Sequence, residues 1–213
     1  MLRLSEQARR LARRIVGPRG APPRLRTALR SLGPGTIAID CGANVGSYTA
    51  YMTERGARVY AFEPNPHAFA VLERTFAGAP NVECRGQAVS DRAGTARLYL
   101  HAQAEEDQVL WSVGSSLVAS KGNVAASYVD VETIDLDAFI AGLDRPVTLL
   151  KLDVEGAELA ILGRLLDSGR LAAIEHVLVE MHDTRIPALR EEGAALRARL
   201  ADAGLRNIWL DWD

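Results

Sequence analysis

The sequence predicts an α/β fold built on a mainly parallel sheet, and two observations carry this prediction. From Thr36 onward, short apolar runs alternate with segments whose apolar residues recur at helical spacing, as expected when each strand is followed by a helix. The 213 residues, 48% hydrophobic and 24% charged, also suffice for one sizeable core. The two cysteines, Cys41 and Cys84, form neither a disulfide framework nor a metal-ligand cluster.

The strands are expected where apolar runs end at polar or turn residues. In chain order they are Thr36–Asp40, Arg58–Phe62, Val82–Ala88, Thr148–Asp153, His176–Met181 and Leu205–Leu210. The helices are expected at Val45–Arg55, Pro66–Phe76, Ala157–Asp167 and Ile186–Ala203.

Between Ser90 and Leu143 this alternation breaks. The stretches DRAGTARLYL and SYVDVETI indicate two added strands, and DLDAFIAGL indicates a short helix. Between the added strands lies a polar segment rich in glycine and serine, at about 100–127. An irregular segment of this length is usually either a functional lid or a disordered loop, and we expect a substrate lid.

Residues 1–35 are expected to form a separate basic helical segment ahead of a domain at 36–213. Nine arginines fall within the first 30 residues against one acid, Glu6. Apolar residues recur at helical spacing from Leu4 to Ile15, and Gly17-Pro18 and Ala21-Pro22-Pro23 interrupt the pattern. We expect this amphipathic helix to pack on the edge of the domain with its arginines in solvent.

Contact of these arginines with an anionic membrane surface or an acidic partner is the alternative. Nucleic acid is not expected, because no aromatic residues lie between the arginines. No run approaches the roughly 18–20 apolar residues of a membrane span. Arginines also stand where a signal peptide would be apolar, so we expect a cytoplasmic protein.

A loop with two glycines follows the first strand. Asp40 ends the strand, Gly42 and Gly46 follow it, and Asn44 stands between them. Ligands of open parallel sheets bind beyond the carboxyl ends of the strands. Gly42 lets a ligand approach the main chain, and Asn44 can cap the turn into a helix whose first N–H groups favour an anion. Glu63, 21 residues after Gly42, is placed to accept both hydroxyls of a ribose.

These residues distinguish between two nucleotide cofactors. A dinucleotide site has the pattern G-x-G-x-x-G, whereas the stretch from Gly42 to Gly46 lacks the middle glycine. Asp40 would repel a pyrophosphate but can bind the ammonium of a methionine moiety, directly or through water. We therefore predict S-adenosylmethionine and not NAD. Gln87 and Ala88 are expected beside the adenine, with a solvated Gln87 as the alternative.

Six stretches then occur in one order along the chain: IDCGANVGSYT, VYAFEPNPHAF, NVECRGQAVSDRAG, the SSL of Ser115–Leu117, LLKLDVEGAELAIL and HVLVEMH. Together they resemble the FkbM family of S-adenosylmethionine-dependent methyltransferases, from Thr36 to about Asp183. The resemblance implies the Rossmann-like class I methyltransferase fold and O-methylation of a hydroxyl on a sugar, polyketide or glycolipid. One departure is that no obvious sequence after Leu210 could form the seventh, antiparallel strand of that fold.

Acids and a histidine follow the fourth and fifth strands. Asp153 and Glu155 stand where the fourth strand opens into the cofactor cleft, and Asp153 is assigned to cofactor binding as well. Glu158 is assigned to the favourable interaction of an acid with a helix N-terminus. His182 ends the fifth strand and titrates in a range useful for removing a hydroxyl proton. We predict Asp153, Glu155 and His182 as catalytic residues, with a surface histidine as the alternative for His182.

No metal is predicted, although Asp153, Glu180 and His182 could together hold a divalent cation that acidifies the hydroxyl. Paired Asp or Asn residues after the fifth strand would match such a site better.

We therefore expect an O-methyltransferase whose small-molecule acceptor is covered by the segment around Ser115 and Ser116. Methylation of RNA ribose or protein, supported only by the basic N-terminus, and a non-catalytic cofactor-binding module are the alternatives. A sheet that ends at Leu205–Leu210 exposes an edge of unpaired backbone groups. We expect a second subunit, in a homodimer, or the N-terminal helix to cover this edge.

Overall fold

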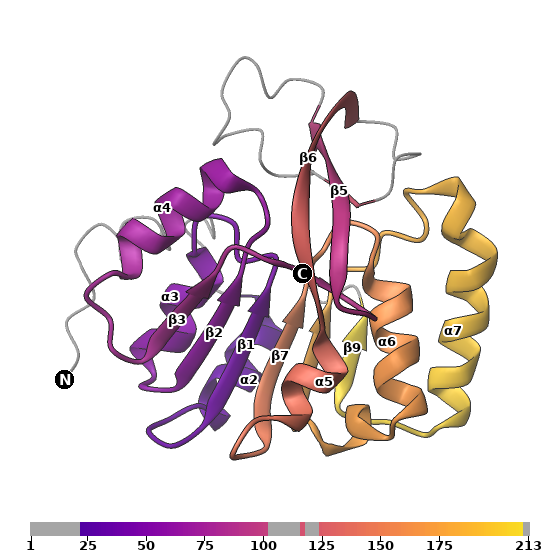
Figure 1. The fold of residues 1–213 in the computed structure, drawn as a ribbon. Coiled ribbons are helices and arrows are strands. Elements are labelled where there is room, and N and C mark those ends of the chain that lie inside the picture. Colours follow the sequence, from indigo (N-terminus) through magenta and orange to yellow (C-terminus); the bar gives the residue numbers. More distant parts are fainter. Residues whose placement is uncertain (1–21, 102–115, 118–123, 211–213) are drawn as a thin grey trace.

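A six-stranded parallel sheet forms the centre of the structure, a computed structural model that describes residues 22–101, 116–117 and 124–210 (Figure 1). The strand order is β3-β2-β1-β7-β8-β9, and all neighbouring strands in this sheet pair in parallel. The order reverses between β1 and β7, which is where ligands of such sheets bind. The strands are β1 (Ile37–Cys41), β2 (Arg58–Phe62), β3 (Val82–Arg85), β7 (Val147–Leu152), β8 (His176–Val179) and β9 (Ile208–Leu210).

Helices cover both faces of this sheet and make it the middle of three layers (Figure 1). Alternate residues of β1 serve the two faces, because successive side chains of a strand point in opposite directions. Ile37 and Ile39 pack with α5 (Leu136–Ala141), α6 (Glu158–Asp167) and α7 (Arg190–Asp202). Ala38 packs on the other face, which carries α2 (Pro23–Ser31), α3 (Ser47–Glu54) and α4 (Pro66–Phe76).

A second sheet has three strands in the order β4-β6-β5. Its strands are β4 (Ala88–Ser90), β5 (Gly94–His101) and β6 (Val124–Asp135), of which β5 and β6 are antiparallel. These two strands extend beyond the carboxyl ends of the central strands (Figure 1). They are the added strands that the sequence predicts. Most of the expected lid at 100–127 lies outside the described residues, apart from its flanks and Ser116-Leu117.

The predicted elements agree with the observed ones in type and mostly in extent. The predicted bounds of β2 and α4 are confirmed. The strand predicted at Val82–Ala88 is wrong in extent: β3 ends at Arg85, and Ala88 begins β4 in the other sheet. The helix predicted at Ile186–Ala203 begins with a short 3-10 turn, Pro187–Leu189, before α7. A second such turn, Arg170–Ala173, precedes β8.

The helix α2 lies before the domain boundary that the sequence predicts at residue 35. Pro22 and Pro23, read as a break, are the N-cap and first residue of α2, where a missing N–H costs nothing. Leu25 and Leu29 of α2 are buried with residues of β1, β7 and β8. The predicted division at residue 35 therefore separates a helix from the sheet it packs on. The amphipathic helix expected before Gly17 lies outside the described residues.

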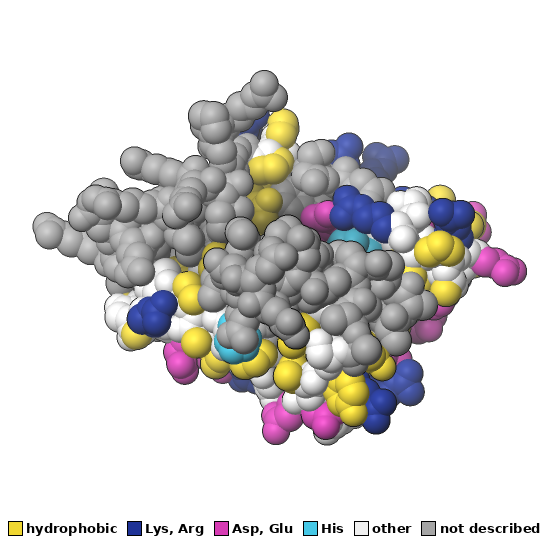
Figure 2. Space-filling model, turned by 90° about the horizontal axis from the view of Figure 1, so that it is seen from above, with side chains coloured by type: hydrophobic (Ala, Val, Ile, Leu, Met, Phe, Trp, Pro, Cys, Tyr) yellow, Lys and Arg dark blue, Asp and Glu magenta, His cyan; other side chains and the backbone are white. Residues whose placement is uncertain are grey.

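The face above the carboxyl ends carries interspersed basic, acidic and apolar side chains on its described part (Figure 2). None of the helices described is both long enough and apolar enough to cross a bilayer. Coverage of the β9 edge by a second subunit stays a prediction.

The packing of α2 predicts a large loss of stability when Leu29 is shortened. Leu29→Ala removes a side chain that is only 2% exposed, so we expect a loss of about 2–5 kcal/mol in the free energy of unfolding. Arg26→Ala, on the exposed side of the same helix, is the matched control, with a change within about 0.5 kcal/mol. Chemical denaturation measures both, and equal stability of the two variants would contradict the assignment of α2 to the core.

Candidate active site

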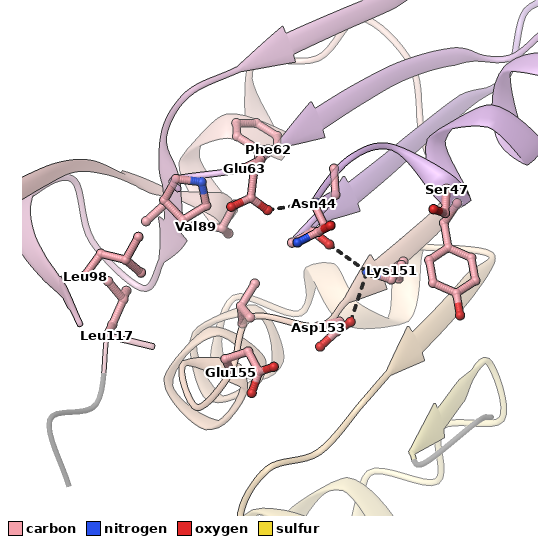
Figure 3. A pocket seen from close by; sticks show the side chains of 16 residues that line it. Asn44, Ser47, Phe62, Glu63, Val89, Leu98, Leu117, Lys151, Asp153 and Glu155 are labelled. Carbon is pink, nitrogen blue, oxygen red and sulfur yellow. Dashed lines mark hydrogen bonds and ion pairs between the residues drawn. The ribbon is translucent and has the colours of Figure 1, made fainter. Parts of the chain in front are cut away.

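A pocket opens at the carboxyl ends of β1, β2 and β7, at the reversal of strand order (Figure 3). Its apolar side includes Val89 of β4, Leu98 of β5 and Leu117. Its polar side includes Glu63 after β2 and the turn after β7. The full lining is Gly42, Ala43, Asn44, Ser47, Tyr48, Phe62, Glu63, Pro64, Ala88, Val89, Leu98, Leu117, Lys151, Asp153, Val154 and Glu155.

Gly42 brings the loop after β1 against the turn after β7. Its φ is +75°, and a Cβ at this position would lie 1.8 Å from the carbonyl oxygen of Asp153. The glycine thus makes room for the protein's own backbone, in addition to lining the pocket. Gly46, the other predicted cofactor glycine, is not in the pocket: it starts α3 with φ +94°, and a Cβ there would collide with Phe76 and Leu72.

Glu63 and Asn44 lie together at the edge of the pocket. The two carboxylate oxygens of Glu63 accept the backbone N–H groups of Asn44 and Asn65, each at 2.8 Å. Each oxygen keeps a second lone pair for a further donor. Burial raises the pKa of Glu63 to about 7, although the two N–H groups act to lower it. The expected capping role of Asn44 is not seen, because Gly46 is the N-cap of α3 and Asn44 Oδ1 accepts the Val45 N–H.

Asp40 does not reach the pocket. Its side chain is fully buried on the face of β1 that carries α3, where Oδ2 accepts a hydrogen bond from the Thr49 hydroxyl at 2.7 Å. Oδ1 lies 3.3 Å from the ammonium nitrogen of Lys151, which is also fully buried. The predicted contact of Asp40 with the methionine ammonium therefore has no direct counterpart, because Lys151 already neutralises this carboxylate.

Lys151 is a pocket residue that sequence reasoning missed. It lies in β7, within a run of apolar residues, and its ammonium contacts Asp40, Asp153 and the carbonyl oxygen of Gly42. A charged residue in the middle of a buried parallel strand was the available signal, since such a residue needs a partner.

The turn after β7 carries two partly buried carboxylates, Asp153 and Glu155, on a strained backbone. Glu155 has a φ of +58°, which is uncommon for a residue with a side chain, and Gly156 follows it with a φ of +118°. The hydroxyl of Ser116 donates to the carbonyl oxygen of Glu155, so the second sheet contacts this turn. Ser115 lies outside the described residues.

Glu158 anchors the turn from the first residue of α6. Its carboxylate accepts the backbone N–H groups of Val154, at 3.0 Å, and Gly156, at 2.9 Å, and it is almost fully buried. It also contacts Nδ1 of His182 at 3.0 Å. The predicted helix-terminal role of Glu158 is thus present, together with an ion pair that the sequence did not indicate.

The side chain of His182 lies between two carboxylates and does not line the pocket. Its Nε2 is 3.0 Å from Glu155, its Nδ1 is 3.0 Å from Glu158, and its side chain is 1% exposed. Burial acts to lower the pKa of His182, but the hydrogen bonds to Glu155 and Glu158 raise it to about 10. The ring is therefore an imidazolium at neutral pH, with both nitrogens donating. The alternative of a surface histidine is wrong, and the protonated ring has no free lone pair to act as a base.

Asp153 is the pocket carboxylate best suited to accept a proton. Its side chain is 26% exposed, and one oxygen lies 3.5 Å from the Lys151 ammonium. Burial raises the pKa of Asp153 to about 6, against the lowering effect of Lys151. Glu180 and Glu155 add to the increase. A group with this pKa is mostly ionised at pH 7 and can take a proton from a nearby hydroxyl.

Asp153, Glu155 and His182 each offer an atom that a cation could bind, within 4.8 Å of one another. Glu180, the third member of the metal alternative in the sequence, is 3.9 Å from His182 and 3.0 Å from Arg185. A metal bound here would have to displace the proton of His182, because a ligating histidine must be neutral.

Gln87 and Ala88 have different places. Ala88 lines the pocket beside Val89, as predicted for a residue near adenine. The amide nitrogen of Gln87 donates to Glu132 at 3.0 Å on the surface, and Gln87 is not among the lining residues. Contact of Gln87 with an adenine stays a prediction.

The fold and the pocket define a Rossmann-like α/β domain with a cavity at the carboxyl edge of its parallel sheet. Residues 40–206 match the methyltransferase FkbM domain. This match spans most of the chain, so the protein belongs to the FkbM family of methyltransferases.

Curated relatives of different size share this domain. AMB antimetabolite synthetase AmbE of Pseudomonas aeruginosa is 30% identical, over 78% of this chain and 9% of its own length. Hexuronic acid methyltransferase AglP of Haloferax volcanii is 27% identical, over 79% and 65%. The 31-O-demethyl-FK506 methyltransferase FkbM of Streptomyces tacrolimicus is 29% identical, over 78% and 72%. The chain thus spans less than two thirds of the length of AmbE and AglP.

Among solved structures, methyltransferase FkbM from Methylobacillus flagellatus KT aligns with 65% of this chain and 30% of its own, at 17% identity. The TM-score of this alignment is 0.41.

The ion pairs of His182 predict that the ring stays protonated well above neutral pH. The folded pKa of about 10 exceeds the ordinary 6.5, so the contacts stabilise the fold fully below about pH 6.5. This contribution is lost as the pH rises toward 10. Nitrogen-15 NMR of the ring at pH 8 should show both nitrogens protonated, and Glu158→Gln should lower the pKa. A neutral ring at pH 7 in the wild type would contradict the geometry.

Proposed function

We propose that this protein is an S-adenosylmethionine-dependent O-methyltransferase acting on a hydroxyl of a small molecule, sugar or glycolipid. The observation that carries the proposal is that Glu63, Asp153 and Glu155 line one pocket at the switch point of a methyltransferase-family domain. A ribose acceptor and a proton acceptor are thus available in the same cavity.

The chain's residues fit the cofactor. Glu63 has lone pairs left for two ribose hydroxyls after it has accepted the N–H groups of Asn44 and Asn65. Val89, Leu98 and Leu117 offer an apolar wall for a base. On the other side of the pocket, the carboxylates of Asp153 and Glu155 favour a cationic group of the cofactor. S-adenosylmethionine, when bound, supplies an electrophilic methyl group on a positively charged sulfur.

The protein's own contribution to transfer is alignment and proton removal. Asp153 would accept the proton of the acceptor hydroxyl, since its pKa of about 6 leaves it ionised at neutral pH. Glu155 would orient the acceptor, because His182 and the Ser116 hydroxyl hold its turn. His182 would act as a fixed cation beneath the turn and not as the base. Holding the two reactants in line supplies much of the acceleration of such a transfer.

The names of two relatives support the acceptor class. AglP is named for hexuronic acid, and the Streptomyces FkbM for an O-demethylated form of FK506. One acceptor is a sugar acid and the other name specifies oxygen as the methylated atom. A hydroxyl of a sugar or a natural product is therefore the first class to assay.

Glu63→Ala should weaken binding of S-adenosylmethionine. Loss of two charge-assisted hydrogen bonds to ribose is expected to cost about 2–4 kcal/mol of binding free energy. Glu73→Ala, an exposed acid on α4, is the control and should bind like the wild type. Isothermal titration calorimetry with S-adenosylhomocysteine measures both, and an unchanged dissociation constant for Glu63→Ala would contradict the ribose contact. Tight binding of NAD without a response to S-adenosylhomocysteine would overturn the cofactor itself.

Asp153→Asn should lower kcat by about 10²–10⁴-fold, the usual contribution of a general base, while cofactor affinity changes little. In the wild type, kcat/KM should fall as the pH drops below about 6, where Asp153 becomes protonated. Turnover of labelled cofactor with candidate acceptors, measured across pH, gives both results.

EDTA should leave the activity intact, because the proposed base needs no metal. Loss of activity with EDTA and its recovery with magnesium would replace base catalysis by the metal alternative. Cofactor binding without turnover on any acceptor would favour the non-catalytic module.

A further inference from the structure

The Lys151 ammonium lies where three segments of the chain converge. It is 3.0 Å from the carbonyl oxygen of Gly42 and 3.4 Å from that of Cys41, both at the end of β1. It is 3.3 Å from Asp40 and 3.5 Å from Asp153, which follows β7. The ring of Tyr48, on α3, has its centroid 5.1 Å from the ammonium. One cation therefore contacts the glycine loop, the acidic turn and the first helix after the loop.

Stability alone does not account for this arrangement. A buried ion pair is often no better for stability than apolar residues of similar size, since both charges lose their hydration. Asp40 and Lys151 are each 0% exposed, and β1 and β7 are otherwise apolar at neighbouring positions. Burial acts to lower the pKa of Lys151, yet Asp40 and Asp153 raise it, so the ammonium stays charged. The charge is thus retained at a place where it reaches a carboxylate of the pocket.

The two loops that Lys151 contacts would bind the two reactants, the cofactor and the acceptor. The loop from Gly42 to Asn44 contacts Glu63 through the Asn44 N–H, on the ribose side. The turn after β7 carries Asp153, on the acceptor side. Figure 3 shows Lys151 between these two sides of the pocket, with a dashed line marking its ion pair to Asp153. A displacement of one side against the other by about 1 Å can cost roughly 100-fold in rate.

We propose that Lys151 is a positioning residue for methyl transfer, which ties the glycine loop after β1 to the acidic turn after β7 through its buried ammonium. The inference rests on the proposed function for its catalytic consequence, but the tie itself is a property of the resting protein. Asp40 is its buried counter-ion, which keeps the ammonium charged and in place.

The test uses a double variant that keeps the buried site neutral overall. Lys151→Met alone would leave Asp40 buried without its partner and is expected to destabilise the fold strongly. Lys151→Met combined with Asp40→Asn removes both charges, so stability should recover in large part. Thr49→Val is the matched control, because it removes the other partner of the Asp40 carboxylate and leaves Lys151 in contact with Asp153.

In the double variant we expect kcat to fall by about 100-fold while the dissociation constant for S-adenosylhomocysteine changes much less. Thr49→Val should keep a kcat close to that of the wild type. If Lys151 served stability alone, the double variant would regain kcat together with its stability. That result would overturn the proposal.

Hydrogen exchange measured by mass spectrometry tests the tie without any turnover. In the double variant, amides of both the 42–46 and the 153–157 segments should exchange faster than in the wild type. Thr49→Val should leave the exchange rates of both segments unchanged. Unchanged exchange in either segment would overturn the proposal even in an active enzyme. Faster exchange in both segments of a protein that transfers no methyl group would support the tie and refute the proposed function.

Discussion

The site depends on the contacts of the buried Lys151 ammonium, because this group lies at the point where the strand order reverses. Parallel strands leave the carboxyl ends of β1 and β7 side by side, and the missing Cβ of Gly42 lets the two following loops touch. Close contact of two loops brings several carbonyl oxygens and carboxylates together. A single cation inside that cluster offsets their mutual repulsion.

His182 has a comparable place after β8, the next strand of the same sheet. His182 follows β8 and lies between the carboxylates of Glu155 and Glu158, at 3.0 Å from each. Asp153 and Glu155, which these two side chains contact, line the pocket together with Glu63. Two carboxylates of the pocket are thus each in contact with a side chain that has almost no exposed surface.

The sequence was sufficient to predict the fold class, because the alternation of apolar runs and helical patterns directly reflects a parallel sheet covered by helices. It also predicted that Glu63, Asp153 and Glu155 meet, since all three follow strands at one edge. It did not predict which side of a strand a residue faces. Asp40 and Lys151 therefore stayed unrecognised as partners, being 111 positions apart in the sequence and neighbours only in the register of β1 with β7.

Segments with proline or glycine are the other places where the sequence predicts the wrong bounds for a helix or a strand. Pro22-Pro23 was interpreted as a break, although proline is equally suited to the first turn of a helix. Gly86 and Gln87 were included in a strand that in fact ends before them. In both cases the local signal is compatible with two structures, and packing of distant residues, such as Leu29 on the sheet, decides between them.

The first turn of α6 is occupied by an anion that belongs to the chain. The N–H groups of Val154 and Gly156, which could hold a phosphate or sulfate, already donate to Glu158. The site therefore differs in kind from the phosphate-gripping loops of other α/β proteins. A phosphate that approached this turn would have to compete with a covalently tethered carboxylate.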